Sequence, residues 1–242
     1  MQFFQPGGVT DDGYRNVRDL KHLDGFRNFV ETLWNEFCHL ADNHFLQDAT
    51  AHFQERFWEM YLAVSLIRRG YSVTANKGVG PDFIVDLNGQ HIQLEATAPG
   101  PGTGTDAVPE MILEIVLRIR SAIAGKLKQF ERALSDGIVG ADDPYVVAIN
   151  GGRIRDAISE GTIPFILKAV FPFGPLNVVW DKNVNGIVDS YYAHRPVIEK
   201  KSGSEVRTDI FASDEAKKIS AVLYSRCDCA NHAENLGDEY YL

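Results

Sequence analysis

The sequence has little cysteine, a shortage of basic residues and no long apolar run, and each shortage argues against a class of protein. Three cysteines among 242 residues cannot form a paired disulfide framework, so we expect a reduced, cytoplasmic protein. No stretch approaches the roughly 18 apolar residues that a membrane-spanning helix needs. Residues 1–13 lack the basic and apolar regions of a secretory signal. We therefore expect no membrane partner.

The shortage of basic residues bears on nucleic-acid binding. Lys and Arg number 24 against 33 Asp and Glu, which gives a net charge of −9. This balance argues against a chain that coats nucleic acid through bulk charge. It leaves a nuclease open, because a local basic patch is enough to follow a phosphate backbone. Hydrophobic residues make up 45%, which is typical of a globular protein with a sizeable core.

The order of the predicted elements indicates an α/β fold with a mixed sheet. Residues 1–22 are polar and contain glycine, so we expect a loose arm there, followed by a helix over 24–42. Residues 48–150 are predicted to form a helix, three strands, a helix and a strand, over 48–69, 71–75, 82–87, 91–97, 107–136 and 145–149. Residues 151–242 are predicted to add a short helix over 162–170 and strands over 177–180, 186–192 and 219–224.

Two carboxylates flank the strongest turn signal in the chain. Asp82 begins an apolar run, Asn88-Gly89 follows, and Glu95 ends the next run. An Asn-Gly pair between two such runs predicts a β-hairpin. Folded back on each other, the strands could bring Asp82 and Glu95 close enough to share one divalent cation. Two carboxylates completed by waters are a usual way of holding Mg²⁺. A turn-capping Asp and a solvated strand-end Glu are the structural alternatives.

A third acid lies on the apolar stripe of the helix predicted over 48–69. Leu62, Ala63 and Leu66 follow Glu59 at helical spacing. A carboxylate buried there needs a cation, a metal or a hydrogen-bond partner. The alternative is a boundary residue paired with a surface Lys or Arg.

The long helix predicted over 107–136 supplies positive charge. Between residues 118 and 132 its charged residues are Arg118, Arg120, Lys126, Lys128, Glu131 and Arg132. Such a run usually forms the solvated face of a helix. Lys126, however, adjoins the apolar stripe at Ile123 and Leu127, which favours a position at the edge of the sheet. Gln129 follows about one turn later on the same side.

Three segments resemble the motifs of the PD-(D/E)XK nuclease superfamily. They are Phe57-Trp58-Glu59-Met60-Tyr61-Leu62-Ala63, Gly80-Pro81-Asp82-Phe83 and Leu94-Glu95-Ala96-Thr97-Ala98-Pro99. The resemblance implies a restriction-endonuclease-like αβββαβ core with a central mixed sheet over residues 48–150. Residues 1–47 would then be an N-terminal arm and helix, and residues 151–242 a C-terminal α/β extension that completes the same domain.

The resemblance also implies a metal-dependent nuclease that uses Mg²⁺ or Mn²⁺. Asp82, Glu95 and the carbonyl of Ala96 would bind the metal, with Glu59 as an outer or additional ligand. The superfamily's motif Lys is replaced by Thr97, which brings no positive charge. Some members carry this Lys on the following helix, and Lys126 is our candidate for that position, which makes Glu59, Asp82, Glu95 and Lys126 the predicted catalytic set.

The expected partner is nucleic acid, with DNA favoured, and a homodimer is left open. The predicted contacts to it are Arg118, Lys128 and Gln129.

Other readings stay open at this point. Thr97 and the net acidity favour a catalytically inactive binding module of the same fold, for nucleic acid or protein. A third reading is a small-molecule or regulatory α/β protein in which the acids form a structural ion-pair network. Cys227, Cys229 and His232, with Cys38-His39, weakly suggest a zinc site.

Overall fold

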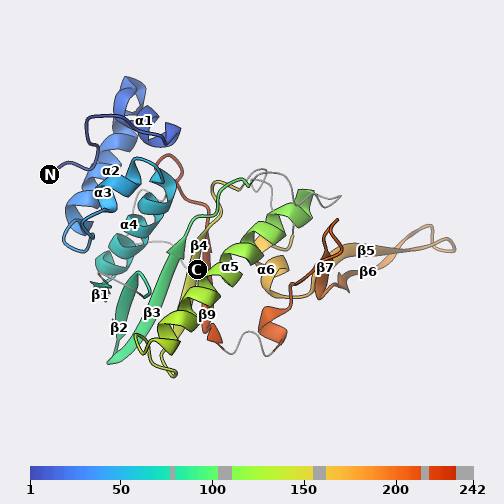
Figure 1. Ribbon diagram of the computed structural model, residues 1–242. Coiled ribbons are helices and arrows are strands. Elements are labelled where there is room, and N and C mark those ends of the chain that lie inside the picture. The colour runs from blue at the N-terminus through green and yellow to red at the C-terminus, as the bar shows by residue number, and fades with distance from the viewer. Residues whose placement is uncertain (77–79, 103–110, 155–161, 214–217, 233–242) are drawn as a thin grey trace. The chain divides into compact units, whose positions relative to one another are not determined.

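The computed structural model describes residues 1–76, 80–102, 111–154, 162–213 and 218–232 (Figure 1). The chain divides into two compact units. The first consists of Met1–Gly100, Gly125–Arg153 and Ile219–Leu242, and the second of Pro101–Ala124 and Ile154–Lys218. The ranges predicted from the sequence, 1–47, 48–150 and 151–242, are continuous. Each of the two units instead combines segments that are distant in sequence.

The first unit contains a five-stranded mixed sheet in the order β1-β2-β3-β4-β9. Its strands are β1 (Ser72–Ala75), β2 (Phe83–Leu87), β3 (Gln90–Thr97), β4 (Tyr145–Asn150) and β9 (Ala221–Ser225). The first three pair antiparallel, and β3, β4 and β9 pair parallel. A mixed α/β fold with a central mixed sheet and several helices is thus confirmed.

The predicted hairpin is confirmed as well. β2 and β3 are joined by Asn88 and Gly89, both of which have positive φ angles, +55° and +86°. A two-residue turn with left-handed backbone at both positions matches the twist of the flanking strands, and Asn-Gly adopts it at low cost. The turn sets the register that pairs Phe83 with Leu94.

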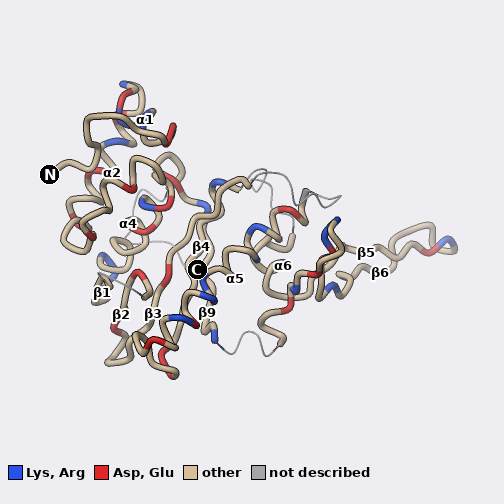
Figure 2. Tube along the Cα trace, in the orientation of Figure 1, with Lys and Arg blue, Asp and Glu red and all other residues tan. Residues whose placement is uncertain are grey.

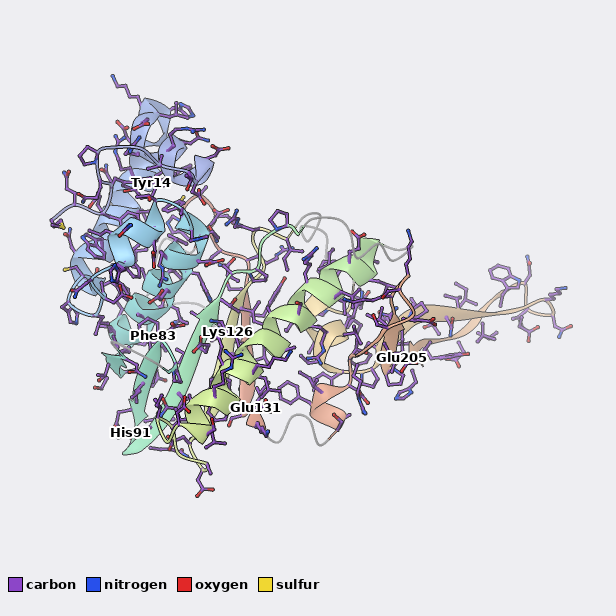
Figure 3. The ribbon with its side chains drawn as sticks, viewed as in Figure 1. Tyr14, Phe83, His91, Lys126, Glu131 and Glu205 are labelled. Carbon is purple, nitrogen blue, oxygen red and sulfur yellow. The ribbon has the colours of Figure 1, made fainter. Side chains whose placement is uncertain are left out.

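The prediction of a loose arm over residues 1–22 is wrong. Phe3, Phe4 and Tyr14 are buried in the main core, and α1 (Asp12–Asp19) is capped by Asp11, whose side chain accepts a hydrogen bond from the Tyr14 N–H. The hydroxyl of Tyr14, labelled in Figure 3, also donates to the Phe3 carbonyl oxygen at 3.1 Å. A few aromatic side chains therefore anchor a segment that is otherwise polar.

Four helices precede the sheet in the chain. After α1 come α2 (Asp24–Phe37), α3 (Phe45–Ala49) and α4 (Phe53–Arg68), with a 3₁₀ turn at Lys21–Leu23. The helix predicted over 48–69 is observed as α4, which begins at Phe53, while Asp48 belongs to the separate short helix α3. Trp58 on α4 donates its indole N–H to the Ala148 carbonyl oxygen at 3.0 Å, which fixes α4 against the sheet.

The two faces of the sheet carry different residues. Phe83, Leu94, Ala96 and Ala148 belong to the core formed with the N-terminal helices. Side chains alternate along a strand, so Glu95 lies on the opposite face, paired in register with Val147. That face packs against the end of α5 (Met111–Ser135), where Phe130 stacks on Tyr145 with ring centroids 4.2 Å apart.

The second unit holds the first part of α5 and a set of short or paired elements. They are α6 (Phe165–Val170), β5 (Phe173–Asp181), β6 (Gly186–His194), β7 (Val197–Glu199), β8 (Glu205–Arg207) and a 3₁₀ turn at Ile210–Ala212. The β7–β8 pair was not predicted, because three-residue strands carry too little alternation to be recognised. Residues 107–110 of the predicted long helix lie outside the described residues. Within the described ranges, no helix has both the length and the apolar character needed to cross a membrane.

We expect Phe3→Ala to destabilise the protein by about 3–5 kcal/mol, the usual cost of removing a fully buried Phe side chain. Phe3 is fully buried against Tyr14, Trp34 and Phe53. Urea denaturation followed by circular dichroism measures the difference, with the exposed Leu20→Ala as the control. Equal stabilities for the two variants would contradict the anchored arm.

Candidate active site

A pocket of about 370 Å³ lies between β3, β4 and the end of α5 in the first unit. Its lining residues are Gly80, Pro81, Asp82, Glu95, Lys126, Gln129, Phe130, Arg132, Ala133 and Tyr145. Three of the four predicted catalytic residues therefore meet at one pocket. Asp82 directly precedes β2, Glu95 lies near the end of β3 and Lys126 lies on α5.

Asp82 is held in place by the backbone of the neighbouring strand. Its Oδ2 accepts a hydrogen bond from the Ala96 N–H at 2.7 Å. Burial raises the pKa of Asp82, while the charge of Lys126 and the hydrogen bond from Ala96 act in the opposite direction. The position follows from the chain, because Gly80 has a φ of +129° and Pro81 then leads into β2.

Glu95 and Lys126 form a largely buried ion pair. Lys126 Nζ lies 2.5 Å from Glu95 Oε1, and the side chains are 20% and 7% exposed. Figure 3 shows Lys126 on α5 above the sheet. Burial raises the pKa of Glu95 to about 7, the negative charge of Asp82 adds to the rise, and Lys126 opposes it. The two carboxylates therefore repel each other beside a single ammonium group.

Glu59 lies away from the pocket and has its own cation. Arg56 Nη1 donates to Glu59 Oε2 at 2.6 Å, and Arg56 Nη2 donates to Asp48 Oδ2 at 3.1 Å. Burial raises the pKa of Glu59 to about 8, with a further rise from the charge of Asp82. Glu59 is thus mostly buried, as its predicted position on the apolar stripe implies. Its ion-pair partner is Arg56, one turn earlier on α4.

The position of α4 explains why the acids do not form one cluster. Glu59 lies on α4, which packs on the face of the sheet covered by the N-terminal helices. Glu95 projects from the opposite face, which packs against α5. Within the described part of the chain, no three His, Cys, Asp or Glu side chains are grouped so that they could hold a metal ion. Asp82, whose charge raises the pKa of both Glu59 and Glu95, connects the two. Ala96, the predicted carbonyl ligand, contacts Asp82 through its N–H.

The predicted nucleic-acid contacts on α5 fall in different places. Gln129 lines the pocket, Lys128 is exposed but does not line it, and Arg118 belongs to the second unit. Figure 2 shows the basic positions that recur along this helix.

Sequence reasoning missed two polar side chains of the pocket. Arg132 lies three residues after Gln129 on α5, and that spacing could have identified it. Tyr145 begins β4, stacks on Phe130 and donates its hydroxyl to the Lys126 carbonyl oxygen at 3.0 Å. Only the pairing of β4 with β3 reveals its place, so no local signal could have found it.

The zinc reading gains no support from the described residues. Among the residues that the structure describes, Cys227, Cys229 and His232 do not form a group of three or more side chains that could hold a metal ion. The His232 ring stacks on Phe29 with centroids 3.6 Å apart.

Comparisons with protein-family models, with curated proteins and with solved structures found no match for this chain.

The raised pKa values predict that stability falls as the pH rises. Glu59 and Glu95, with pKa values of about 8 and about 7 in the folded protein against 4.5 for the free side chain, hold protons that the unfolded chain has already released. The folded state is therefore favoured near pH 5, and this advantage is lost between about pH 5 and pH 8. We expect the thermal midpoint to fall over this range in a pH series.

Glu59→Gln should flatten the pH dependence, because it removes one of the two titrating groups. Glu55→Gln is the matched control, since Glu55 lies on the same helix but is exposed. Identical pH profiles for wild type and Glu59→Gln would contradict the assignment.

Proposed function

We propose that the chain is a metal-dependent nuclease of the PD-(D/E)XK type, which hydrolyses phosphodiester bonds in nucleic acid at the pocket around Asp82. The observation that carries the proposal is the convergence of Asp82, Glu95 and Lys126 on one pocket. A pair of carboxylates with an adjacent ammonium group suits a divalent cation and a phosphate together. The motif resemblance and the αβββαβ order around the mixed sheet support the same assignment.

The donor set fits a magnesium or manganese ion. Asp82 and Glu95 would hold it, because both are oxygen ligands and because burial, and after it the charge of Asp82, raises the pKa of Glu95. A cation between them would relieve this repulsion. Two carboxylates suffice for Mg²⁺, which usually keeps several waters or substrate phosphate oxygens as its other ligands. When bound, the metal would supply an activated water and polarise the phosphate.

Lys126 would neutralise the negative charge that develops on the reacting phosphate. Its ammonium group already contacts Glu95 Oε1 at 2.5 Å, so it lies beside the proposed metal ligand without help from Thr97. The hydrogen bond from Tyr145 to the Lys126 carbonyl fixes the backbone of α5 at this point. Fixed charges at the site of reaction stabilise a transition state without costly rearrangement.

Ala96 and Glu59 would act around this centre. The Ala96 N–H orients the Asp82 carboxylate, and the carbonyl of the same residue is the proposed additional metal ligand. Glu59, which the Arg56 pair holds on the other face of the sheet, would act as an outer group that influences Asp82 through its charge. We therefore assign Glu59 a positioning role.

Nucleic acid would approach along the end of α5. Gln129 and Arg132 line the pocket beside Lys126, and Lys128 is exposed on the same segment. Lys126, Lys128 and Arg132 would form the local basic patch that a chain with a net charge of −9 needs to bind a polyanion. The proposed substrate is DNA.

Cleavage assays with linear, circular and single-stranded DNA, and with RNA, in Mg²⁺ or Mn²⁺ test the proposal. We expect Asp82→Asn to lower the rate by at least about 100-fold, because it removes one of the two carboxylate ligands of the metal. Lys126→Met should lower the rate by about 10–1000-fold through loss of charge stabilisation.

Asp86→Asn, at the far end of β2 and 43% exposed, is the control and should keep wild-type activity. Metal-dependent melting of wild type and Asp82→Asn separates lost metal binding from lost folding. The absence of cleavage in any substrate and metal would leave the inactive binding module as the better reading.

Arg132 is expected to contact a phosphate. In an Asp82→Asn background, Arg132→Met should weaken DNA binding uniformly across sequences and reduce the slope of log K against log salt by about 1. Lys182→Met, on the other unit, is the control. Titrations at several salt concentrations give both slopes, and equal slopes would remove Arg132 from the interface.

A further inference from the structure

The β5–β6 hairpin of the second unit has one face that is apolar and open to solvent. Pairing in the hairpin sets Leu176 opposite Tyr192 and Val178 opposite Ser190, and after a one-residue register shift between Val179 and Trp180 it sets Trp180 opposite Ile187. Directly paired residues share a face, so these six side chains form one surface, which we call the ribbon face. Leu176 and Val178 are 50% exposed, Trp180 is 57% exposed and Ile187 is 64% exposed.

The opposite face of the hairpin is polar in comparison. It carries Asn177, Val179, Asp181, Asp189 and Tyr191. The two faces therefore differ in charge, because the opposite face carries Asp181 and Asp189 whereas the ribbon face carries no charged side chain. A two-stranded hairpin is at best marginally stable alone in water. Solvent-exposed apolar patches of this kind mark interaction surfaces.

We propose that the ribbon face binds the ribbon face of a second copy of this chain, so that the two hairpins pack antiparallel across a two-fold axis. The ribbon face contains no charged side chain, so an identical face can approach it without repulsion between like charges. The proposal does not depend on the nuclease assignment.

The order of side-chain sizes along the hairpin supports a second copy as the occupant. The small pair Val178–Ser190 lies midway between Leu176–Tyr192 and Trp180–Ile187, two residues from each along β5. With the two-fold axis at Val178, the Trp180 of each copy lies over the Leu176–Tyr192 pair of the other. At each end of the interface, Trp180 of one copy then contacts the Leu176–Tyr192 pair of the other. At the centre, the Val178–Ser190 pairs of the two copies contact each other.

The available area predicts the strength of the dimer. An aromatic side chain presents roughly 150–250 Å². With Trp180 more than half exposed and three aliphatic side chains at least half exposed, the apolar contribution is on the order of 300 Å² per copy. Interfaces are about 60% apolar, so this corresponds to about 1,000 Å² in total. That value is the lower limit for a specific complex, which predicts a weak, concentration-dependent dimer.

Sedimentation velocity of the full-length protein over a range of concentrations tests this inference. We expect a reversible monomer–dimer equilibrium with a dissociation constant in the micromolar range. The double variant Trp180→Ser, Ile187→Thr should raise the constant by at least about tenfold. The matched control, Val179→Thr with Tyr191→Thr on the opposite face, should leave it unchanged. A wild type that stays monomeric, or a double variant that still dimerises like wild type, would overturn the proposal.

Tryptophan fluorescence provides a test that needs no interface variant. The chain has three Trp residues, and Trp34 and Trp58 are 5% and 2% exposed while Trp180 is 57% exposed. A shift of the emission to shorter wavelength with rising protein concentration would therefore come from Trp180 as it is buried. Dimerisation without any such shift would place the interface elsewhere and contradict the proposal. Nuclease activity can be absent while both results hold, so the two proposals fail separately.

Discussion

The burial of Glu95 in the sheet constrains the structure around it. A carboxylate on a central strand has to meet a cation, because an unpaired buried charge costs several kcal/mol. Lys126 meets it at 2.5 Å from a helix 31 residues later in the chain. The same stretch of α5 is held by the Phe130–Tyr145 stack and by the Tyr145 hydroxyl. The ion pair, the ring stack and this hydrogen bond together fix the end of α5 on β3 and β4.

Local sequence signals were sufficient for much of this arrangement. The Asn88-Gly89 turn set the hairpin, and the alternation of helices and strands indicated the mixed sheet. The position of Lys126 beside an apolar stripe placed it toward the sheet, where it contacts Glu95. The hairpin and the position of Lys126 were inferred from residues close together in sequence, a distance over which periodicity and turn chemistry act.

What the sequence could not reveal depends on contacts between distant segments. Phe3 is buried because Trp34 and Phe53 surround it, so a composition-based reading of residues 1–22 failed. The pairing of β9 with β4 brings residues 221–225 into the five-stranded sheet. The local sequence of β9 does not indicate which strand it pairs with. Glu59 was correctly placed on a buried stripe, but which face of the sheet that stripe covers is a property of the assembled fold.

The balance of charges distinguishes the two readings of the acidic residues. A purely structural network would pair each buried acid, and apolar side chains would often serve stability better. Glu59 has Arg56 and Glu95 has Lys126, whereas the contact described for the Asp82 side chain is a backbone N–H. Burial is the main cause of the raised pKa values of Glu59 and Glu95, and the charge of Asp82 raises both further, so it works against the stability of the pairs beside it. Unfavourable electrostatics of this kind concentrate at functional sites, and a cation bound by Asp82 would remove them.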